Sequence, residues 1–177
     1  EARAIHALVH AMPPVRRDAV LARFRDAVEH LRQAGLLEQL REFDRLPASE
    51  RSAMGLAYFR TRLPCPFLED ESCSIHAERP VICREFLVTS DPRHCAEPSP
   101  ATTRRVRLDA RISRGLTALD APPADRRAPT WIALTLALEW TEGQPAEAAR
   151  PATQLLQDLF SRLSGQDLDA REAPGET

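Results

Sequence analysis

Four cysteines are the residues of this chain whose type and spacing best suit chemistry, and all four fall within one 31-residue segment. They are Cys65, Cys73, Cys83 and Cys95, separated by seven, nine and eleven residues. Thiolates are the ligands that soft metals and iron–sulfur clusters select, and four of them complete one tetrahedral site or one cluster. The segment therefore predicts one metal centre with these four residues as its ligands.

Two other interpretations of the cysteines stay open at this point. Two disulfides would require an oxidising compartment, which no extracellular signature in the sequence indicates. Four unrelated buried cysteines, each acting as a small hydrophobe, would not all be expected in one poorly periodic segment. The clustering and spacing favour a metal centre over both.

The spacing also bears on which metal is bound. Structural zinc is usually held by C-x2–4-C pairs, because a tight turn aims two thiolates at one ion. Here no two cysteines are closer than eight positions. Ligands spread in this way suit either metal, but they fit the larger body of an iron–sulfur cluster better. We expect a [4Fe–4S] cluster, with structural zinc as the alternative.

Three neighbours of the cysteines suit a role around such a centre. Four thiolates with zinc(II), or with an oxidised four-iron cluster, leave a net charge of about −2 that the protein must offset. Arg79 and Arg84 are close to the ligands in sequence and are able to donate charge-assisted hydrogen bonds to sulfur. His76 suits packing or hydrogen bonding, and it is a further ligand candidate. We predict these three residues as part of the cofactor-binding site.

The rest of the chain has the periodicity of helices. Apolar residues recur at helical spacing from Val20 to Leu31, for example. We expect helices over residues 2–11, from Pro14 to a break at Gly35, and over 49–62, 80–86, 108–119, 131–140 and 151–163, with a further apolar stripe from Leu36 to Leu46. Asp109 is a candidate helix cap, and the alternation in 104–108 leaves a short strand there open. The predicted fold is all-α, a single helical domain over residues 1–165 followed by a polar tail at 166–177.

Residues 63–100 interrupt this helical pattern with six prolines and little periodicity. We therefore expect a central irregular cysteine-rich insert, a metal-binding loop with one short helix inside it. The proline content is the reason, because proline removes a backbone donor and breaks regular hydrogen bonding.

Composition limits the function classes. The 24 basic and 26 acidic residues nearly balance, which argues against a general nucleic-acid binder. The longest apolar run, residues 131–138, is too short for a membrane span. Every basic residue is arginine, so a lysine nucleophile or a P-loop lysine is excluded. With six glycines and no glycine-rich phosphate motif, a Rossmann unit is not expected.

The cysteine segment also resembles a known family. Residues 65–68 read CPFL, residues 73–76 read CSIH, and residues 79–84 read RPVICR. In type and order these residues are similar to those of the YkgJ-type cysteine-cluster family, described as zinc- or iron-chelating, and Cys95 fits its later cysteine. The resemblance implies a bound metal or iron–sulfur cluster and a bacterial cytoplasmic setting. A flagellin lysine methylase carries a related cysteine domain, so the resemblance also allows an enzyme.

Two departures from that family matter. His76 stands where the family usually has tyrosine. Many members also carry an upstream C-x-x-C-x-x-C-C group, whereas residues 1–64 contain no cysteine. Either that group belongs upstream of Glu1, or this branch works with four ligands.

The leading hypothesis for function is an iron–sulfur protein for electron transfer, sensing or metal handling, acting with a protein or redox partner. A zinc-stabilised protein-interaction module is one alternative, and an enzyme related to the methylases is another. For the enzyme, Glu85, His76 and His94 are the nearest candidates for a general base. Two weaker patterns, His6 with His10 and the arginines of 104–114, are expected to be solvated helix faces.

Overall fold

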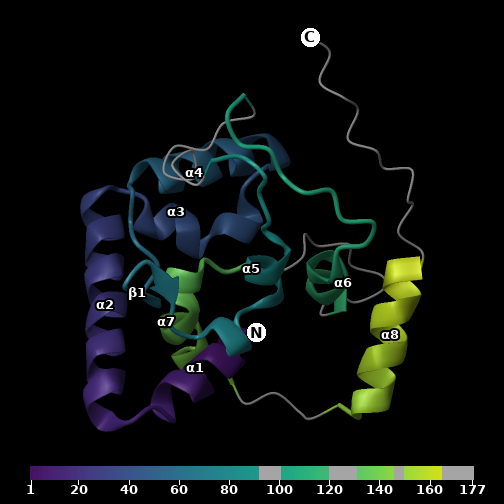
Figure 1. Ribbon diagram of the computed structural model, residues 1–177, viewed down its shortest axis with the longest axis horizontal. Helices are drawn as coiled ribbons and strands as arrows, with labels where there is room; N and C mark the ends of the chain where they lie inside the picture. The colour runs from purple at the N-terminus through teal and green to yellow at the C-terminus, as the bar shows by residue number, and fades with distance from the viewer. Residues whose placement is uncertain (92–100, 120–130, 146–149, 165–177) are drawn as a thin grey trace.

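The computed structural model describes residues 1–91, 101–119, 131–145 and 150–164, and this part of the chain is mainly α-helical (Figure 1). The α-helices are α1 (Ala2–His10), α2 (Pro14–Gln33), α3 (Leu37–Arg41), α4 (Ala48–Arg60), α5 (Val81–Glu85), α6 (Ile112–Leu119), α7 (Ala137–Glu142) and α8 (Ala152–Ser164). The 3-10 turns are η1 (Phe43–Arg45), η2 (His76–Glu78) and η4 (Leu134–Leu136), and the strands are β1 (Leu68–Glu69) and β2 (Ser72–Cys73). Within these ranges no helix combines the length and the apolar character needed to cross a membrane.

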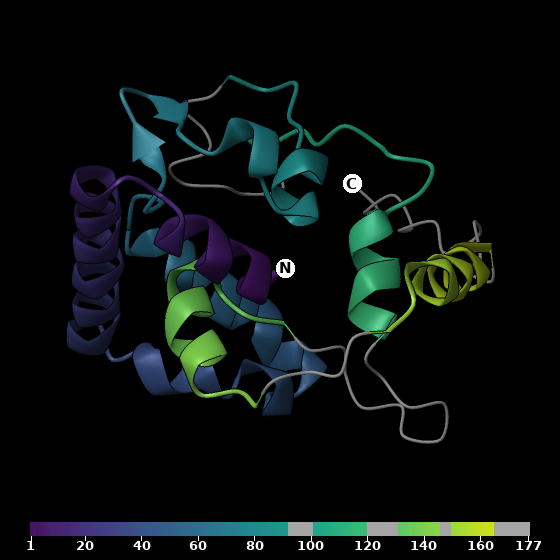
Figure 2. The same cartoon turned by 90° about the horizontal axis from the view of Figure 1, so that it is seen from below.

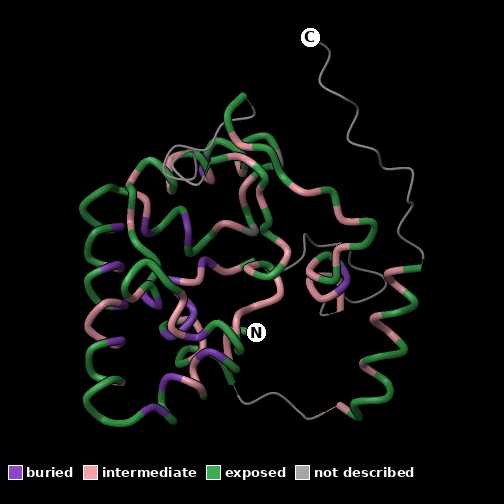
Figure 3. The backbone as a smooth tube through the Cα atoms, in the orientation of Figure 1, coloured by how far each residue is buried: buried purple, intermediate pink, exposed green. Residues whose placement is uncertain are grey.

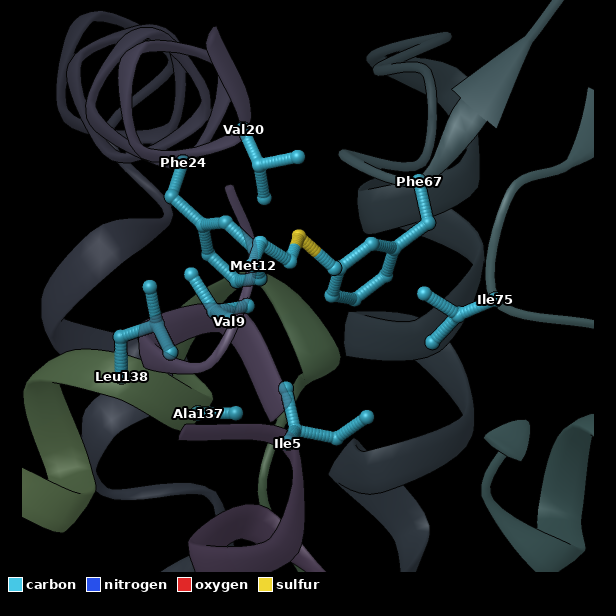
Figure 4. Packing of buried hydrophobic residues seen from close by; sticks show 9 residues of the cluster. All are labelled: Ile5, Val9, Met12, Val20, Phe24, Phe67, Ile75, Ala137 and Leu138. Atoms are coloured by element: carbon cyan, nitrogen blue, oxygen red, sulfur yellow. The ribbon is translucent and has the colours of Figure 1, made fainter. Parts of the chain in front are cut away.

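The first hydrophobic core lies where α1, α2 and α7 meet the cysteine segment (Figure 4). The predicted apolar stripe of α2 is confirmed, because Val20, Phe24, Ala27 and Leu31 are all buried. From the cysteine segment, Phe67 enters this core, and its ring meets that of Phe24 edge-on at 5.4 Å between centroids. The buried members of the cluster are Ile5, Val9, Met12, Val20, Phe24, Phe67, Ile75, Ala137 and Leu138.

A second core joins the end of α2 to α3, α4 and η4. Its buried members are Leu31, Leu37, Leu40, Met54, Ala133 and Leu136. Most buried residues belong to these two neighbouring clusters, whereas α6 and α8 stand to one side of them (Figure 3). The pair formed by α6 and α8 packs closely at Gly115, where an added Cβ would come within 2.6 Å of Leu159 Cδ1.

The expectation of an irregular segment over residues 63–100 is wrong at one place. Residues 68–73 form a β-hairpin in which Leu68 pairs with Cys73 and Glu69 with Ser72. Its two-residue turn, Asp70-Glu71, has positive φ at both positions, 47° and 59°. Positive φ at both central residues is the mark of a type I′ turn, whose twist matches that of the strands it joins. The strands of this hairpin are too short for an alternating sequence pattern to reveal them.

The starts of two predicted helices also differ from the structure. The helix expected over 108–119 begins at Ile112, and Asp109 does not cap it. The carboxylate of Glu85, from α5, accepts hydrogen bonds from the backbone N–H and the hydroxyl of Ser113. The helix expected over 131–140 begins as the 3-10 turn η4 and continues as α7 to Glu142. The strand left open near residue 105 is a single antiparallel bridge between Val88 and Arg105.

The hairpin turn gives a test of the fold. Replacing Glu71 (φ 59°) by glycine removes the steric cost of the left-handed conformation, so Glu71→Gly should stabilise the protein by about 1 kcal/mol. Urea unfolding followed by circular dichroism measures the change. The matched variant Ser72→Gly places glycine in the adjacent strand and should destabilise the protein by about 0.5–1 kcal/mol. Equal losses in both variants would contradict the turn.

Candidate metal centre

Cys65 is held in a tight turn that leads into the hairpin. The backbone N–H of Leu68 donates to the carbonyl of Cys65 at 2.9 Å, and Pro66 supplies the fixed φ that such turns favour. The same turn directs the backbone N–H of Phe67 at the sulfur of Cys65. A backbone donor aimed at a thiolate stabilises its charged form, the form that binds metals.

Cys73 lies on β2, directly across the hairpin from Leu68. It is partly buried and packs against the first core. Two residues further on, Ile75 is buried in that core at 3 % exposure, just as Phe67 follows Cys65 by two positions. Each of the two thiols is therefore held next to a residue that the core fixes in place.

Cys83 lies in the short helix α5, which begins after Pro80 as the sequence predicts. Proline before or at a helix start costs little, because its missing N–H would have no partner there. The carboxylate of Glu1 accepts a hydrogen bond from the backbone N–H of Val81 at 2.6 Å. A side chain distant in sequence thus caps the helix that carries Cys83. In Figure 2 the hairpin and α5 lie on the same side of α1 and α7.

The three described cysteines are free thiols, and their charges act on one another. Cys65 is an exposed residue overall, yet loss of water around its sulfur raises the pKa of its thiol. The charge of Cys73 raises it further, while the Phe67 N–H and the guanidinium of Arg23 oppose the change. Burial likewise raises the pKa of Cys83, followed by the charges of Cys65, Cys73 and Glu1, with Arg79 opposing. The hairpin and α5 therefore bring three thiols into one electrostatic neighbourhood.

The three thiols are ligands of the kind that a soft metal prefers, but their side chains do not form a coordination shell. In the described ranges, no group of three or more His, Cys, Asp or Glu side chains is gathered closely enough to hold a metal ion. Cys95, the fourth predicted ligand, and His94 lie outside the described residues. The chemistry of the three thiols nevertheless suits a cation. The charges of neighbouring thiolates oppose ionisation of Cys65 and Cys83, and a bound positive charge would offset that repulsion.

The three predicted neighbours of the site have different positions. Arg79 lies near enough to Cys83 to favour its thiolate, and its Nε donates to the carbonyl of His76 at 3.3 Å. Arg84 donates instead to the carbonyls of Arg79 and Ala77, at 2.8 and 2.6 Å. It therefore braces the turn before α5. The side chain of His76 is exposed in η2.

Sequence reasoning missed two residues beside the thiols. Arg23, from α2, donates to the Leu68 carbonyl at 3.2 Å and to the Glu69 carboxylate at 2.5 Å, and its charge favours the Cys65 thiolate. Tyr58, from α4, has a raised pKa, mainly through burial and in part through the charge of Cys65. Both lie on helices whose sequence patterns carry no mark of the distant cysteines, so only the fold reveals them.

Two other predicted candidates have structural roles. Both carboxylate oxygens of Glu85 are held by Ser113, which makes Glu85 a poor general base. His6 and His10 share a helix face as expected, with their rings stacked at 4.0 Å. In addition, Nδ1 of His10 makes a 2.8 Å hydrogen bond with the carbonyl of His6.

Comparison with known families agrees with this geometry. Residues 26–102 match the family model CxxCxxCC, described as "Putative zinc- or iron-chelating domain", which confirms the YkgJ-type resemblance inferred from the cysteine segment. The match covers all four cysteines and begins within α2. No curated protein and no solved structure matches the chain. The segment with the three thiols is thus the part of the chain that a metal-chelating family describes.

The ion pair between Arg23 and Glu69 predicts a pH dependence of stability. Its hydrogen bond lowers the pKa of the Glu69 carboxyl below the ordinary value of about 4.3. The pair therefore contributes fully above that ordinary value and is lost as the pH falls through the lowered folded value. Because about a third of each side chain is exposed, at 32 % and 35 %, the contribution should be below about 1 kcal/mol.

Urea unfolding of the metal-free wild type and of the metal-free Glu69→Gln variant, between pH 7 and pH 3, measures the contribution of the ion pair to stability. The free energy of unfolding of the two proteins should differ at neutral pH and converge in acid. A difference that stays constant across this range would contradict the ion pair.

Proposed function

We propose that this chain binds one metal centre through Cys65, Cys73, Cys83 and Cys95, and that the centre is an iron–sulfur cluster used in electron transfer, sensing or metal handling. The observation that carries the proposal is that three free thiols, from a turn, a strand and a helix, lie near enough for their charged forms to influence one another, although they do not form a coordination shell. The family match supports metal chelation by the same segment. The cluster would supply a redox-active or metal-storing group that the chain's own side chains lack.

The surrounding charges support this proposal. Arg23 and Arg79 favour the thiolates of Cys65 and Cys83 respectively, as expected around a centre with net negative charge. Their effect does not outweigh burial and thiol repulsion, since the pKa of both thiols remains raised. Protons therefore occupy these sites in the absence of a metal, and metal binding would release them.

Zinc is the second candidate, because the family description names both zinc and iron. A structural zinc at the same thiols would tie the hairpin to α5 and make the segment a protein-interaction module. Such a protein would be colourless and would lose order when a chelator removes the metal.

Elemental analysis and a visible spectrum of anaerobically purified protein distinguish these candidates. An iron–sulfur protein of the favoured type should be brown, with about four irons and four sulfides per chain. A structural zinc protein should be colourless with about one zinc per chain. Purified protein containing neither metal, after anaerobic handling and after reconstitution with iron and sulfide, would overturn the proposal.

The four cysteines give a second, residue-level test. Cys65→Ala, Cys73→Ala, Cys83→Ala and Cys95→Ala should each lower the metal content at least about tenfold, because one unfilled position exposes the centre. Ser72→Ala, next to Cys73 in β2, is the matched control and should retain the wild-type content. Full metal occupancy in any one of the four cysteine variants would remove that residue from the ligand set.

A further inference from the structure

Five arginines lie close together in sequence in the segment that pairs with the chain after α5, and two of them, Arg105 and Arg111, line one hollow beside the helix that carries Cys83. The five lie within residues 104–114, and no ion pair joins any of them to a carboxylate in the part of the chain that the structure describes. Composition alone suggests a plain solvated face. The five arginines are Arg104, Arg105, Arg107, Arg111 and Arg114.

Backbone hydrogen bonds connect this arginine segment to α5. After α5 ends, the chain pairs with the arginine segment: Val106 N–H donates to the Leu87 carbonyl at 2.9 Å, and Thr89 N–H donates to the Arg104 carbonyl at 2.9 Å. The Glu85 carboxylate then attaches the start of α6. The arginines are consequently fixed relative to α5.

A small hollow lies at the centre of this region, between α5 and the paired segment. It is lined by Ile82, Glu85, Phe86, Arg105, Val106 and Arg111 and has a volume of about 50 Å³. Sites for small organic ligands are typically several hundred Å³, so this hollow suits a single side chain. Its apolar members are incompletely covered, with Ile82 52 % and Phe86 40 % exposed.

The lining of this hollow contains two basic residues, Arg105 and Arg111, and one acidic residue, Glu85, whose carboxylate already accepts hydrogen bonds from Ser113. The guanidinium of Arg105 lies over the ring of Phe86, 5.1 Å from its centroid, which fixes it by a cation–π contact. An apolar centre with arginines around it is the usual anatomy of a protein–protein interface, and arginine is enriched among the residues that dominate binding energy.

We propose that this surface docks an acidic segment of a partner protein, with one apolar side chain of the segment in the hollow and its carboxylates paired with Arg105 and Arg111. Carboxylates match arginine in a bidentate geometry. A single-stranded nucleic acid would instead need aromatic rings with a free face for base stacking, and Arg105 already lies over the ring of Phe86.

Docking at this place would bring the partner to the helix that holds a proposed metal ligand. Ile82 and Phe86 flank Cys83 in sequence along α5 and its end. The inference deepens the proposed function. Docking itself does not require the metal centre, and only the biological purpose of docking rests on the proposed function. The residues of the surface themselves are separate from the proposed ligands, so the two ideas are tested separately.

The test is an NMR titration of the full chain with a short peptide that has a central leucine flanked by glutamates. Backbone signals of Ile82, Phe86 and Val106 should shift, and added salt should weaken binding because the attraction is between exposed charges. The same peptide with glutamine in place of glutamate should bind about tenfold more weakly or worse.

Three double variants complete the experiment. Arg105→Glu with Arg111→Glu should weaken peptide binding at least about tenfold, and Arg105→Gln with Arg111→Gln serves if the first pair fails to fold. The control, Arg25→Glu with Arg60→Glu, changes exposed arginines on α2 and α4 and should bind as the wild type does.

The outcomes separate this inference from the metal proposal. Equal losses in the control pair, no shift at the hollow, or tighter binding of a single-stranded oligonucleotide at the same residues would overturn the docking proposal. Metal content measured on the same samples should match the wild type in every arginine variant. Protein that binds the peptide but contains no metal would overturn only the metal centre.

Discussion

The arrangement of the thiols depends on the burial of Phe67 and Ile75. These two side chains, at 1 % and 3 % exposure, fix the cysteine segment to the core formed by α1, α2 and α7. Burying a side chain of this size contributes roughly 1.5–3 kcal/mol, and the edge-on contact of Phe67 with Phe24 adds roughly 0.5–1.5 kcal/mol. A segment rich in proline therefore gains a defined position from two apolar residues, each two positions after a cysteine.

The electrostatic surroundings of this position determine how readily its thiols ionise. Burial and mutual repulsion raise the pKa of the thiols of Cys65 and Cys83, and the nearby arginines only partly offset this. Purely structural cysteines behave as small hydrophobes, whereas Cys65 and Cys83 would each experience the charge of a neighbouring thiolate if they ionised. A bound cation would attract each thiolate and so offset the repulsion between them. The positive charge of the proposed metal centre would account for these observations together.

Much of this fold could be predicted from local sequence patterns. The apolar stripe of α2, the proline before α5 and the extent of α8 each follow from residues within the element. The hairpin could not be predicted, because its strands are two residues long and its turn, Asp70-Glu71, lacks the glycine or asparagine that marks a type I′ turn. Helix caps supplied by distant residues could not be predicted either: the start of α6 is capped by Glu85 and not by the nearby Asp109.

The same limit applies to the site. The four cysteines could be picked out as candidate ligands because their type and clustering are local properties, and their role as ligands stays a prediction. Arg23 could not, since it acts on the hairpin from 46 residues away along the chain, measured to Glu69. Likewise, its place beside Cys83 in the sequence makes Arg84 a candidate donor to sulfur, but it does not reveal that its guanidinium donates to the carbonyls of Arg79 and Ala77. Residue type indicates what a side chain is able to bind, and only the fold decides what it reaches.

X-ray absorption at the edge of the bound metal tests the central idea most directly, because it identifies the atoms that contact the metal. The account predicts a first shell of sulfur neighbours, at about 2.3 Å for zinc. A first shell made only of nitrogen and oxygen, at about 2.0–2.2 Å, would show that the metal lies elsewhere and would contradict the account.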